Sequence, residues 1–419
     1  MSSVGRIEGP SFLDDARLRR LFDALDGDGE EMRVVGGAVR NHLMHVPVHE
    51  VDLATTATPT QTMARAKAAG LKSVPTGIEH GTVTTIVDHM PFEITTLRED
   101  VETDGRRAIV AFGRDFEADA MRRDFTFNAL SVRADGTLFD YANGLADIER
   151  RHVRFIGDPD ARIREDYLRI LRFFRFHAAF GEGEADPQAL RAIGLNRAGL
   201  DGLSRERVRA ECLKLLEARN AAPVIGQMSG LGLMLPILGG VAMPARLARI
   251  VAIEAVRGAK PDALLRLGAL AILKREDALR LRERLRLSNA ECKRLAEGAD
   301  TRAKWHARPM PPDAQTILTW LFLDGCTATC DALDLGHAEC SAPPDDAAWQ
   351  SARRFAAETP VPRLPIGGAD LLARGIPAGK AVGEALKAVQ QSWIAAGFPE
   401  RPEALAPMIA AALASKTSD

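Results

Sequence analysis

The sequence predicts an α+β fold, in which a small mixed α/β head with a β-sheet is followed by an all-helical neck, body and tail. Up to about residue 150, short runs of β-branched residues alternate with segments of helical character. Beyond that point strand signals fade, and Ala, Leu and Arg recur at helical spacing. Segments 341–346 and 359–368 are rich in Pro and Gly, which is typical of linkers between helices.

Short strands and helices alternate in the head. Strands are predicted at residues 32–35, 51–54, 82–87, 92–97 and 137–140. A first helix should begin near Ala38. Thr58 and Pro59 are typical of an N-cap and a first helical position, so a second helix should run to about Ala69. Residues 88–91 should close a hairpin between the third and fourth strands.

Apolar side chains at helical spacing organise the rest of the chain. One long helix is predicted where a single face carries Ile163, Tyr167, Ile170, Phe174 and His177. Another is predicted behind a candidate N-cap at Ser204, with an apolar face made by Val208, Cys212, Leu215 and Leu216. We therefore divide the chain into an N-terminal extension (1–30), head (31–150), neck (151–230), body (231–345) and tail (346–419).

The composition is that of a soluble globular protein, with 46% hydrophobic and 27% charged residues. A formal net charge of −2 excludes a wholly basic nucleic-acid binder. The sequence has no apolar run of the ~18 residues that a membrane span needs, and its polar N-terminus has no signal core. Five cysteines do not make a disulfide framework. We expect a cytoplasmic protein without membrane association, and nothing in the sequence implies a protein partner.

A turn between strand and helix is the first candidate for anion binding. Gly36 and Gly37 follow the first predicted strand and precede a helix, so backbone N–H groups could approach an anion there. Arg40 falls in the first helical turn and would add a positive charge. Taken alone, the pattern favours a tight strand–helix turn with a surface arginine.

Three carboxylates on predicted strands are candidates for catalysis. Glu50 and Asp52 are two residues apart, so in a strand they share a face while Val51 and Leu53 enter the core. Glu93 should also point away from the core. Neighbouring carboxylates repel unless a cation lies between them, and Mg²⁺ prefers such ligands together with substrate phosphates. The pattern therefore predicts a two-metal site for phosphoryl transfer, with a solvated acidic strand as the alternative.

Several ordered motifs resemble one family. Residues 36–40 (GGAVR), 50–55 (EVDLAT), 80–84 (HGTVT) and 93–98 (EITTLR) are similar to the head motifs of class II tRNA nucleotidyltransferases. These are the CCA-adding enzymes and related bacterial poly(A) polymerases of the polymerase-β superfamily. The resemblance continues through residues 122–128 (RRDFTFN), Asp140, Gly144, Asp147, 165–169 (EDYLR) and 206–211 (ERVRAE), and a weaker similarity lies between residues 368 and 393.

The resemblance implies a template-independent enzyme that adds CCA to tRNA 3′ ends from CTP and ATP and releases pyrophosphate. It implies catalytic roles for Glu50, Asp52 and Glu93, with Glu50 and Asp52 as Mg²⁺ ligands. It also implies nucleotide binding by Gly36, Gly37, Arg40, Arg122, Arg123, Asp124, Glu165, Asp166, Arg169 and Arg172. Arg122 and Arg123 would hold the triphosphate, and Asp124 would prefer ribose over deoxyribose. The helical neck would recognise the base, and the body and tail would bind the acceptor stem and elbow of tRNA.

Asp166 and Arg169 have a chemical reason to select the base. Cytosine and adenine both present an amine beside a ring-nitrogen acceptor, which matches one aspartate acceptor and one arginine donor. Uracil and guanine present a carbonyl and an N–H instead. In the resembled family this motif is described as a protein template, with Glu165 and Arg172 expected to hold the pair. The alternative is an i,i+3 salt bridge on one helix face, contributing about 0.2–0.5 kcal/mol.

Two positions differ from the usual family pattern. Glu50-x-Asp52 stands where the family usually has Asp-x-Asp, and Arg40-Asn41 stands where it usually has Arg-Asp. These departures motivate one alternative, a catalytically weakened tRNA-binding protein. The other alternative is a poly(A) polymerase of the same superfamily. Enzymes of the resembled family that add only CC are described as lacking a flexible loop in the region that corresponds to residues 98–120. This segment has ordinary length here, so the resemblance favours complete CCA addition.

The other candidates are weaker. Cys326, Cys330, His337 and Cys340 could bind zinc by count, but their spacing fits no common zinc pattern, so buried or half-buried thiols are favoured. Arginines at 205, 207 and 209 and the basic segment 274–286 could contact tRNA phosphates or form solvated helix faces.

Overall fold

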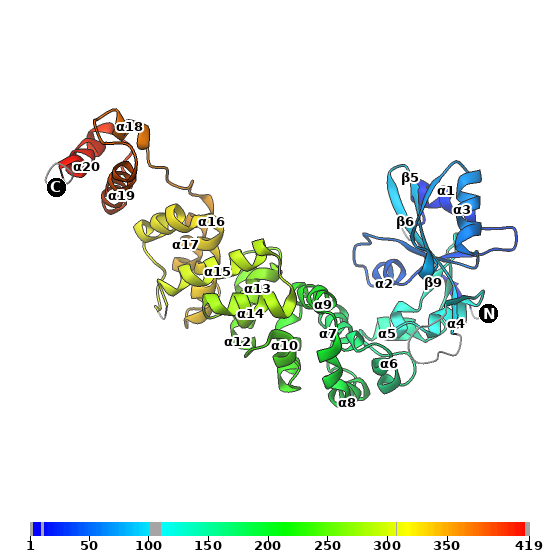
Figure 1. Cartoon of the computed structure of the whole chain (residues 1–419). Helices are drawn as coiled ribbons and strands as arrows, with labels where there is room; N and C mark the ends of the chain where they lie inside the picture. The colour runs from blue at the N-terminus through cyan, green and yellow to red at the C-terminus, as the bar shows by residue number, and fades with distance from the viewer. Residues whose placement is uncertain (1–2, 10–11, 101–109, 307, 415–419) are drawn as a thin grey trace. The chain divides into compact units, whose positions relative to one another are not determined.

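The computed structural model describes residues 3–9, 12–100, 110–306 and 308–414. The chain forms two compact units, Met1–Arg207 and Val208–Asp419, and their boundary falls inside the predicted neck. Figure 1 shows a sheet with helices in the first unit and helices in the second. The α+β prediction is confirmed, while the five-part division stays a prediction.

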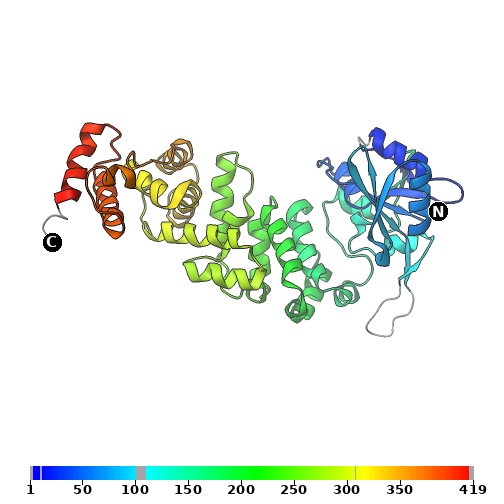
Figure 2. The same cartoon turned by 45° about the horizontal axis from the view of Figure 1, so that its top comes forward.

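An eight-stranded sheet forms the centre of the first unit (Figures 1 and 2), with the strand order β1-β10-β9-β2-β3-β6-β5-β4. Its strands are β1 (Ser3–Arg6), β2 (Met32–Val35), β3 (Asp52–Thr55), β4 (Lys72–Gly77), β5 (Thr82–Val87), β6 (Met90–Thr96), β9 (Ser131–Val132) and β10 (Thr137–Phe139). Neighbouring strands are antiparallel except β3 and β6, which run parallel. These two strands therefore run in the same direction through the middle of the sheet.

The hairpin prediction is confirmed, and its turn is shorter than expected. Val87 pairs with Met90, so Asp88 and His89 alone make the turn. Both have positive φ, 47° and 66°, as a two-residue turn that matches the strand twist requires. A separate two-stranded sheet joins β7 (Arg98–Asp100) to β8 (Val110–Phe112).

Two helices cover the β4–β5 side of the sheet. Helix α1 (Ala16–Leu25) packs against α3 (Pro59–Ala68) and β5, and α3 packs against β4 and β5 (Figure 1). The predicted start of α3 is confirmed, because the Thr58 hydroxyl accepts from the Gln61 N–H in a capping box. Helix α1 is not among the predicted helices, and it lies within the segment assigned to the N-terminal extension. Its sequence signal is an Asp15 N-cap before apolar residues at helical spacing.

The predicted single helix through residues 163–177 is wrong. The structure has α6 (Pro159–Glu165) and α7 (Leu168–Phe180), separated by Asp166 with an extended backbone (φ −154°, ψ 105°). The Asp166 carboxylate accepts from the Leu168 N–H at 3.1 Å, a local bond that competes with helix continuation. Apolar periodicity alone did not reveal this break. The other α-helices of the first unit are α2 (Gly37–Leu43), α4 (Phe116–Met121), α5 (Gly144–Glu149) and α8 (Pro187–Asn196).

A cluster of phenylalanine rings fixes the segment 122–128 against α7. The Phe125 ring lies 4.8 Å from Phe155 and 5.3 Å from Phe176, measured between centroids. Phe127 also contacts Phe176 at 5.3 Å, and Phe173 stacks on Phe155. The polar residues that alternate with Phe125 and Phe127 are thereby held in place beside α7.

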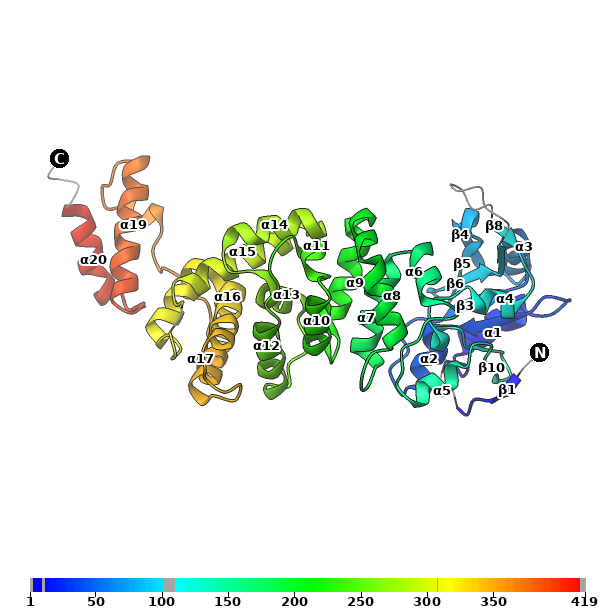
Figure 3. The same ribbon diagram turned by 90° about the horizontal axis from the view of Figure 1, so that it is seen from below.

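The second unit is helical (Figure 3). Helix α9 (Arg205–Glu217) crosses the boundary and begins directly after Ser204, as predicted. It is followed by α10 (Ala221–Gly230), α11 (Met234–Leu238), α12 (Pro244–Val256), α13 (Ala263–Ala271), α14 (Arg275–Leu285), α15 (Asn289–Ala303), α16 (Ala314–Glu339), α17 (Ala347–Glu358), α18 (Gly368–Leu372), α19 (Lys380–Ala395) and α20 (Pro402–Ala414). Residues 341–346 and 359–367 contain no helix, and α18 begins at Gly368, the last residue of the second predicted linker. Among the described residues, no helix has the length and apolar character to cross a membrane.

Candidate active site

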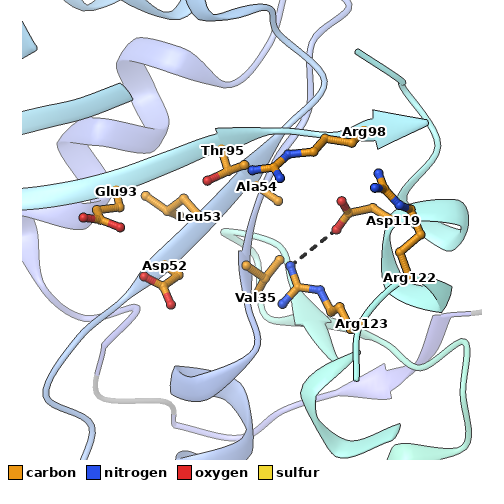
Figure 4. Close-up of a pocket in the computed structure, with 10 residues that line it drawn as sticks. All are labelled: Val35, Asp52, Leu53, Ala54, Glu93, Thr95, Arg98, Asp119, Arg122 and Arg123. Carbon is orange, nitrogen blue, oxygen red and sulfur yellow. Dashed lines mark hydrogen bonds and ion pairs between the residues drawn. The ribbon is translucent and has the colours of Figure 1, made fainter. Parts of the chain in front are cut away.

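Asp52 and Glu93 lie side by side on two adjacent interior strands of the sheet. Asp52 begins β3 and pairs in register with Glu93 of the parallel strand β6. Their neighbours Leu53 and Ile94 are buried, so the two carboxylates share the opposite, solvent-accessible face (Figure 4). Partial burial raises the pKa of Asp52, and the negative charges of Glu93 and then Glu50 raise it further. Like charges held together in this way favour the approach of a cation.

The prediction that Glu50 shares a strand face with Asp52 is wrong. Strand β3 begins at Asp52, and residues 46–51 form no regular element. The Glu50 side chain is nevertheless near, since it lines a cavity of about 540 Å³ together with Asp52 and Glu93. An exposed glutamate on irregular backbone can adjust its position, whereas Asp52 and Glu93 are fixed by strand pairing.

The carboxylates at this site suit Mg²⁺, which needs few protein ligands, better than a metal ion that is coordinated by protein side chains alone. The described residues contain no group of three or more His, Cys, Asp or Glu side chains arranged to hold a metal ion. Mg²⁺ usually takes one or two carboxylates and completes its coordination with water and substrate phosphates. Asp52 and Glu93 supply two carboxylates on one face.

The turn before α2 is built for close approach. Gly36 has φ 64° and ψ −116°, a conformation that disfavours other residues. A Cβ on Gly36 would lie 2.9 Å from Nη1 of Arg123, so any other residue here would displace the end of the Arg123 side chain. The predicted strand–glycine–helix turn is present, and it brings Arg123 against the helix start.

A buried chain of hydrogen bonds runs from Arg40 to Arg172. Arg40 Nη1 donates to Asn128 Oδ1 at 2.6 Å, and Asn128 Nδ2 donates to Asp124 Oδ1 at 3.0 Å. Asp124 Oδ2 accepts from Arg172 Nε at 2.6 Å. Asn41 Oδ1 accepts from Nε and Nη2 of Arg40. Arg40, Asn128 and Asp124 are thus held as one unit.

Burial and neighbouring charges shift the pKa values of Asp124 and Arg40. Burial would raise the pKa of Asp124, but Arg172, Asn128 and the Phe125 N–H outweigh it and hold the pKa below 3.8. Burial, followed by the repulsion of Arg175, lowers the pKa of Arg40 to about 10. Both groups therefore remain charged at neutral pH.

Arg122 and Arg123 directly follow the C-terminal end of α4. Arg123 donates to Asp119 Oδ2 at 3.4 Å (Figure 4) and to the Asn128 carbonyl at 3.3 Å. Both arginines line a cavity of about 390 Å³ that also contains Asp52 and Glu93. This places two guanidinium groups within one hollow with the candidate metal ligands.

Asp166 and Arg169 have separate partners. Arg207 Nη2 lies 2.5 Å from Asp166 Oδ2, while Arg169 Nη1 donates to Glu165 and, at 2.7 Å, to the Arg162 carbonyl. The alternative interpretation, an Asp166–Arg169 salt bridge on one helix face, does not match the described contacts. Glu165 holds Arg169 as expected, but Arg172 bonds Asp124 instead of the Asp166–Arg169 pair.

One cavity of about 430 Å³ brings most of the predicted nucleotide-binding residues together. Its lining includes Gly36, Gly37, Arg40, Asp52, Arg122, Arg123, Asp124, Asn128, Asp166, Arg169, Arg172 and Arg207. Asp52 also lines both cavities that contain Glu93. Glu50 and Glu165 do not line the 430 Å³ cavity.

Sequence reasoning missed Asn128 and the contact of Arg207 with Asp166. Asn128 had a signal, since residues 124, 126 and 128 are polar and alternate with Phe125 and Phe127. Arg207 was considered for tRNA contact, and its 41-residue separation from Asp166 left no local signal.

The comparisons with known proteins agree with this geometry. The family described as Poly A polymerase head domain matches residues 32–154. The one described as probable RNA and SrmB-binding site of polymerase A matches residues 184–243. The CCA tRNA nucleotidyltransferase 1, mitochondrial, of Mus musculus is 34% identical over 409 residues, which cover 94% of this chain and 90% of that protein. The chain belongs to the CCA tRNA nucleotidyltransferase family.

Bacterial members of the family are also similar. The CCA-adding enzyme of Leuconostoc citreum is 42% identical over 207 residues, covering 48% of this chain and 49% of that protein. The crystal structure of the Bacillus stearothermophilus CCA-adding enzyme in complex with CTP superposes with a TM-score of 0.73 at 27% identity, over 99% of this chain and 100% of that one. The Thermotoga maritima CCA-adding enzyme complexed with tRNA shares the fold, with a TM-score of 0.68 at 18% identity and coverage of 97% and 96%.

Several of the arginines considered for tRNA contact also have partners within the protein. Arg209 pairs with Glu291, and Arg280 and Arg284 donate to backbone carbonyls within the second unit. Cys326 is exposed and Cys330 is buried, with their sulfur atoms 3.9 Å apart, and His337 stacks on Trp349. Residues 101–109 of the segment expected to favour CCA over CC addition lie outside the described residues.

Proposed function

We propose that this protein is a template-independent RNA nucleotidyltransferase that adds CCA to tRNA 3′ ends from CTP and ATP. The in-register pair Asp52–Glu93 carries the proposal, because it places two carboxylates beside a cavity lined by arginines. That arrangement suits transfer of a nucleotidyl group from a triphosphate. The names of the relatives support tRNA as the acceptor.

Each part of the site has a task in this proposal. Asp52 and Glu93, with Glu50 nearby, would hold Mg²⁺, which when bound supplies Lewis-acid stabilisation of the transferring phosphoryl group. Arg122 and Arg123 would bind the triphosphate oxygens.

Sugar and base are assigned to the other end of the cavity. Asp124 would accept a hydrogen bond from a ribose hydroxyl. Asp166 would accept from the exocyclic amine of cytosine or adenine, and Arg169 would donate to the ring nitrogen. Asp166 and Arg169 do not have to break a bond to each other before they bind the base, because Asp166 pairs with Arg207 and Arg169 pairs with Glu165.

An incorporation assay tests the proposal and separates it from both alternatives. The purified protein is incubated with Mg²⁺ and tRNA ending before CCA, or with tRNA ending in CC, together with each labelled NTP separately. CTP alone should extend the first substrate by two residues, and ATP alone should extend the second by one. Continued ATP addition would indicate a poly(A) polymerase, and tRNA binding without incorporation would indicate the catalytically weakened protein.

The remaining expectations concern the partners and the compartment. The body and tail are proposed to bind the acceptor stem and elbow of tRNA. Cytoplasmic location stays a prediction, and the Mus musculus relative is named as a mitochondrial protein.

A further inference from the structure

Arg207 holds the carboxylate that is proposed to read the base. It lies in the first turn of α9, and its Nη2 is 2.5 Å from Asp166 Oδ2. The other oxygen, Oδ1, accepts from the Leu168 N–H at 3.1 Å. Both residues line the same cavity of about 430 Å³. Each carboxylate oxygen of Asp166 is therefore fixed by a different donor.

These two donors decide which way Asp166 faces. Its backbone is extended between α6 and α7, so helix packing does not restrict the side chain. Arg169 is oriented independently, by Glu165 and the Arg162 carbonyl. The relative geometry of the acceptor and the donor that a base would meet therefore depends on Arg207.

We propose that Arg207 is a positioning residue for base selection. By holding Oδ2, it keeps a lone pair of Asp166 directed at the place where the exocyclic amine of cytosine or adenine would lie. Without Arg207 the carboxylate can rotate, and a water molecule can bridge it to the carbonyl of uracil or guanine. The inference rests on the proposed base reading by Asp166 and Arg169. It assigns to Arg207 a task other than contact with tRNA phosphate.

Selectivity for CTP over UTP is the quantity to measure. The ratio of kcat/KM values for single-nucleotide extension of tRNA lacking CCA should fall about fivefold in Arg207→Ala. The effect is modest because the Arg207 side chain is 51% exposed. Arg207→Lys keeps the positive charge but lacks the planar guanidinium group, so its CTP-to-UTP ratio should lie between those of the wild type and Arg207→Ala.

A matched control removes a similar charge next to the site. Arg164 is an exposed residue of α6 that pairs with Asp160 and does not line the cavity. Arg164→Ala should leave the CTP-to-UTP ratio unchanged. An equal loss in both variants would mean that general electrostatics, and not positioning, sets the ratio, which would overturn the inference.

A double-mutant cycle separates this inference from the proposed function. If Arg207 acts through Asp166, then Arg207→Ala should not change the ratio further in an Asp166→Asn background. Additive effects, or a normal ratio in Arg207→Ala, would refute the role of Arg207. If Asp166→Asn itself keeps the wild-type ratio, base reading by Asp166 fails, and with it the proposed function of that residue.

Discussion

Asn128 is the junction at which the structure makes a quantitative prediction. Its side chain accepts from Arg40 at 2.6 Å and donates to Asp124 at 3.0 Å, so it bonds one positive and one negative group. The three residues are 7%, 9% and 8% exposed, respectively. Replacing Asn128 with Ala leaves both charges without this partner in a poorly hydrated place.

The expected cost follows from those two bonds. A hydrogen bond to a charged group contributes about 1.5–3 kcal/mol, and water entering from the adjoining cavity would recover part of the loss. We expect Asn128→Ala to destabilise the first unit by about 2–3 kcal/mol. At about 2–4 °C per kcal/mol for a domain of this size, its Tm should fall by about 4–12 °C.

Function should change as well, because Asn128 orients Asp124. If Asp124 accepts from the ribose, the preference for CTP over dCTP should fall about tenfold, equivalent to about 1.4 kcal/mol. Both quantities are accessible, the first by calorimetry and the second by single-nucleotide extension of tRNA. Calorimetry below the transition confirms how much variant is folded during the kinetic assay.

Asn196→Ala is the matched control for this prediction. Asn196 is half-buried and also donates to a carboxylate, Asp160, at 2.6 Å, but it does not line the cavity. The control should lose some stability and keep the preference for CTP. If Asn128→Ala melts like wild type and prefers CTP as strongly, then Asn128 does not orient Asp124 and the proposed link between them is wrong.

Three further predictions concern the metal, acid stability and tRNA. Asp52→Ala should lower the rate of nucleotide incorporation by at least about a hundredfold, since a bound metal ion stabilises the transition state by several kcal/mol. The Tm should stay unchanged, because Asp52 pairs with the neighbouring strands through its backbone. Normal turnover would exclude Asp52 as a metal ligand. The Asp124 pKa is held below 3.8 in the folded protein, so the ionised Asp124 stabilises the fold above that pH, and this contribution is lost as the pH falls through the folded value. Asp124→Asn should therefore lower the free energy of unfolding, measured with urea, more at pH 7 than below pH 3.8. Equal losses at both pH values would contradict this. Binding of tRNA should weaken steeply between about 50 and 200 mM salt. Arg282→Glu, on the exposed face of α14, should raise the KM for tRNA without raising the KM for CTP. An unchanged KM for tRNA would show that Arg282 does not contact tRNA.

The sequence predicted the parts of the site that depend on local pattern. Alternation within strands placed Asp52 and Glu93 on one face, and the Thr58 and Pro59 signals located α3. The motifs showed which residues belong together, although they are far apart in the chain. These features are encoded within a few residues, so a single sequence reveals them.

The errors arose where the periodicity of residue types does not show how the backbone and side chains are bonded. Periodicity suggested one helix through residue 166, but Asp166 bonds the Leu168 N–H and Arg207, and its backbone leaves the helix. Glu50 has the spacing of a strand residue, yet β3 begins two residues later. No local signal shows that Arg172 bonds Asp124, since 48 residues separate them.

The departure at Asn41 is consistent with the site when its contacts are considered. Its Oδ1 accepts from Arg40, as a carboxylate could, but its Nδ2 also donates to the Pro47 carbonyl at 3.2 Å. An ionised aspartate has no donor for that second bond. The amide thus ties the end of α2 to the segment that leads into Asp52. Because it is neutral, it also leaves the charge of Arg40 uncompensated at that contact, which favours anion binding in the cavity that Arg40 lines.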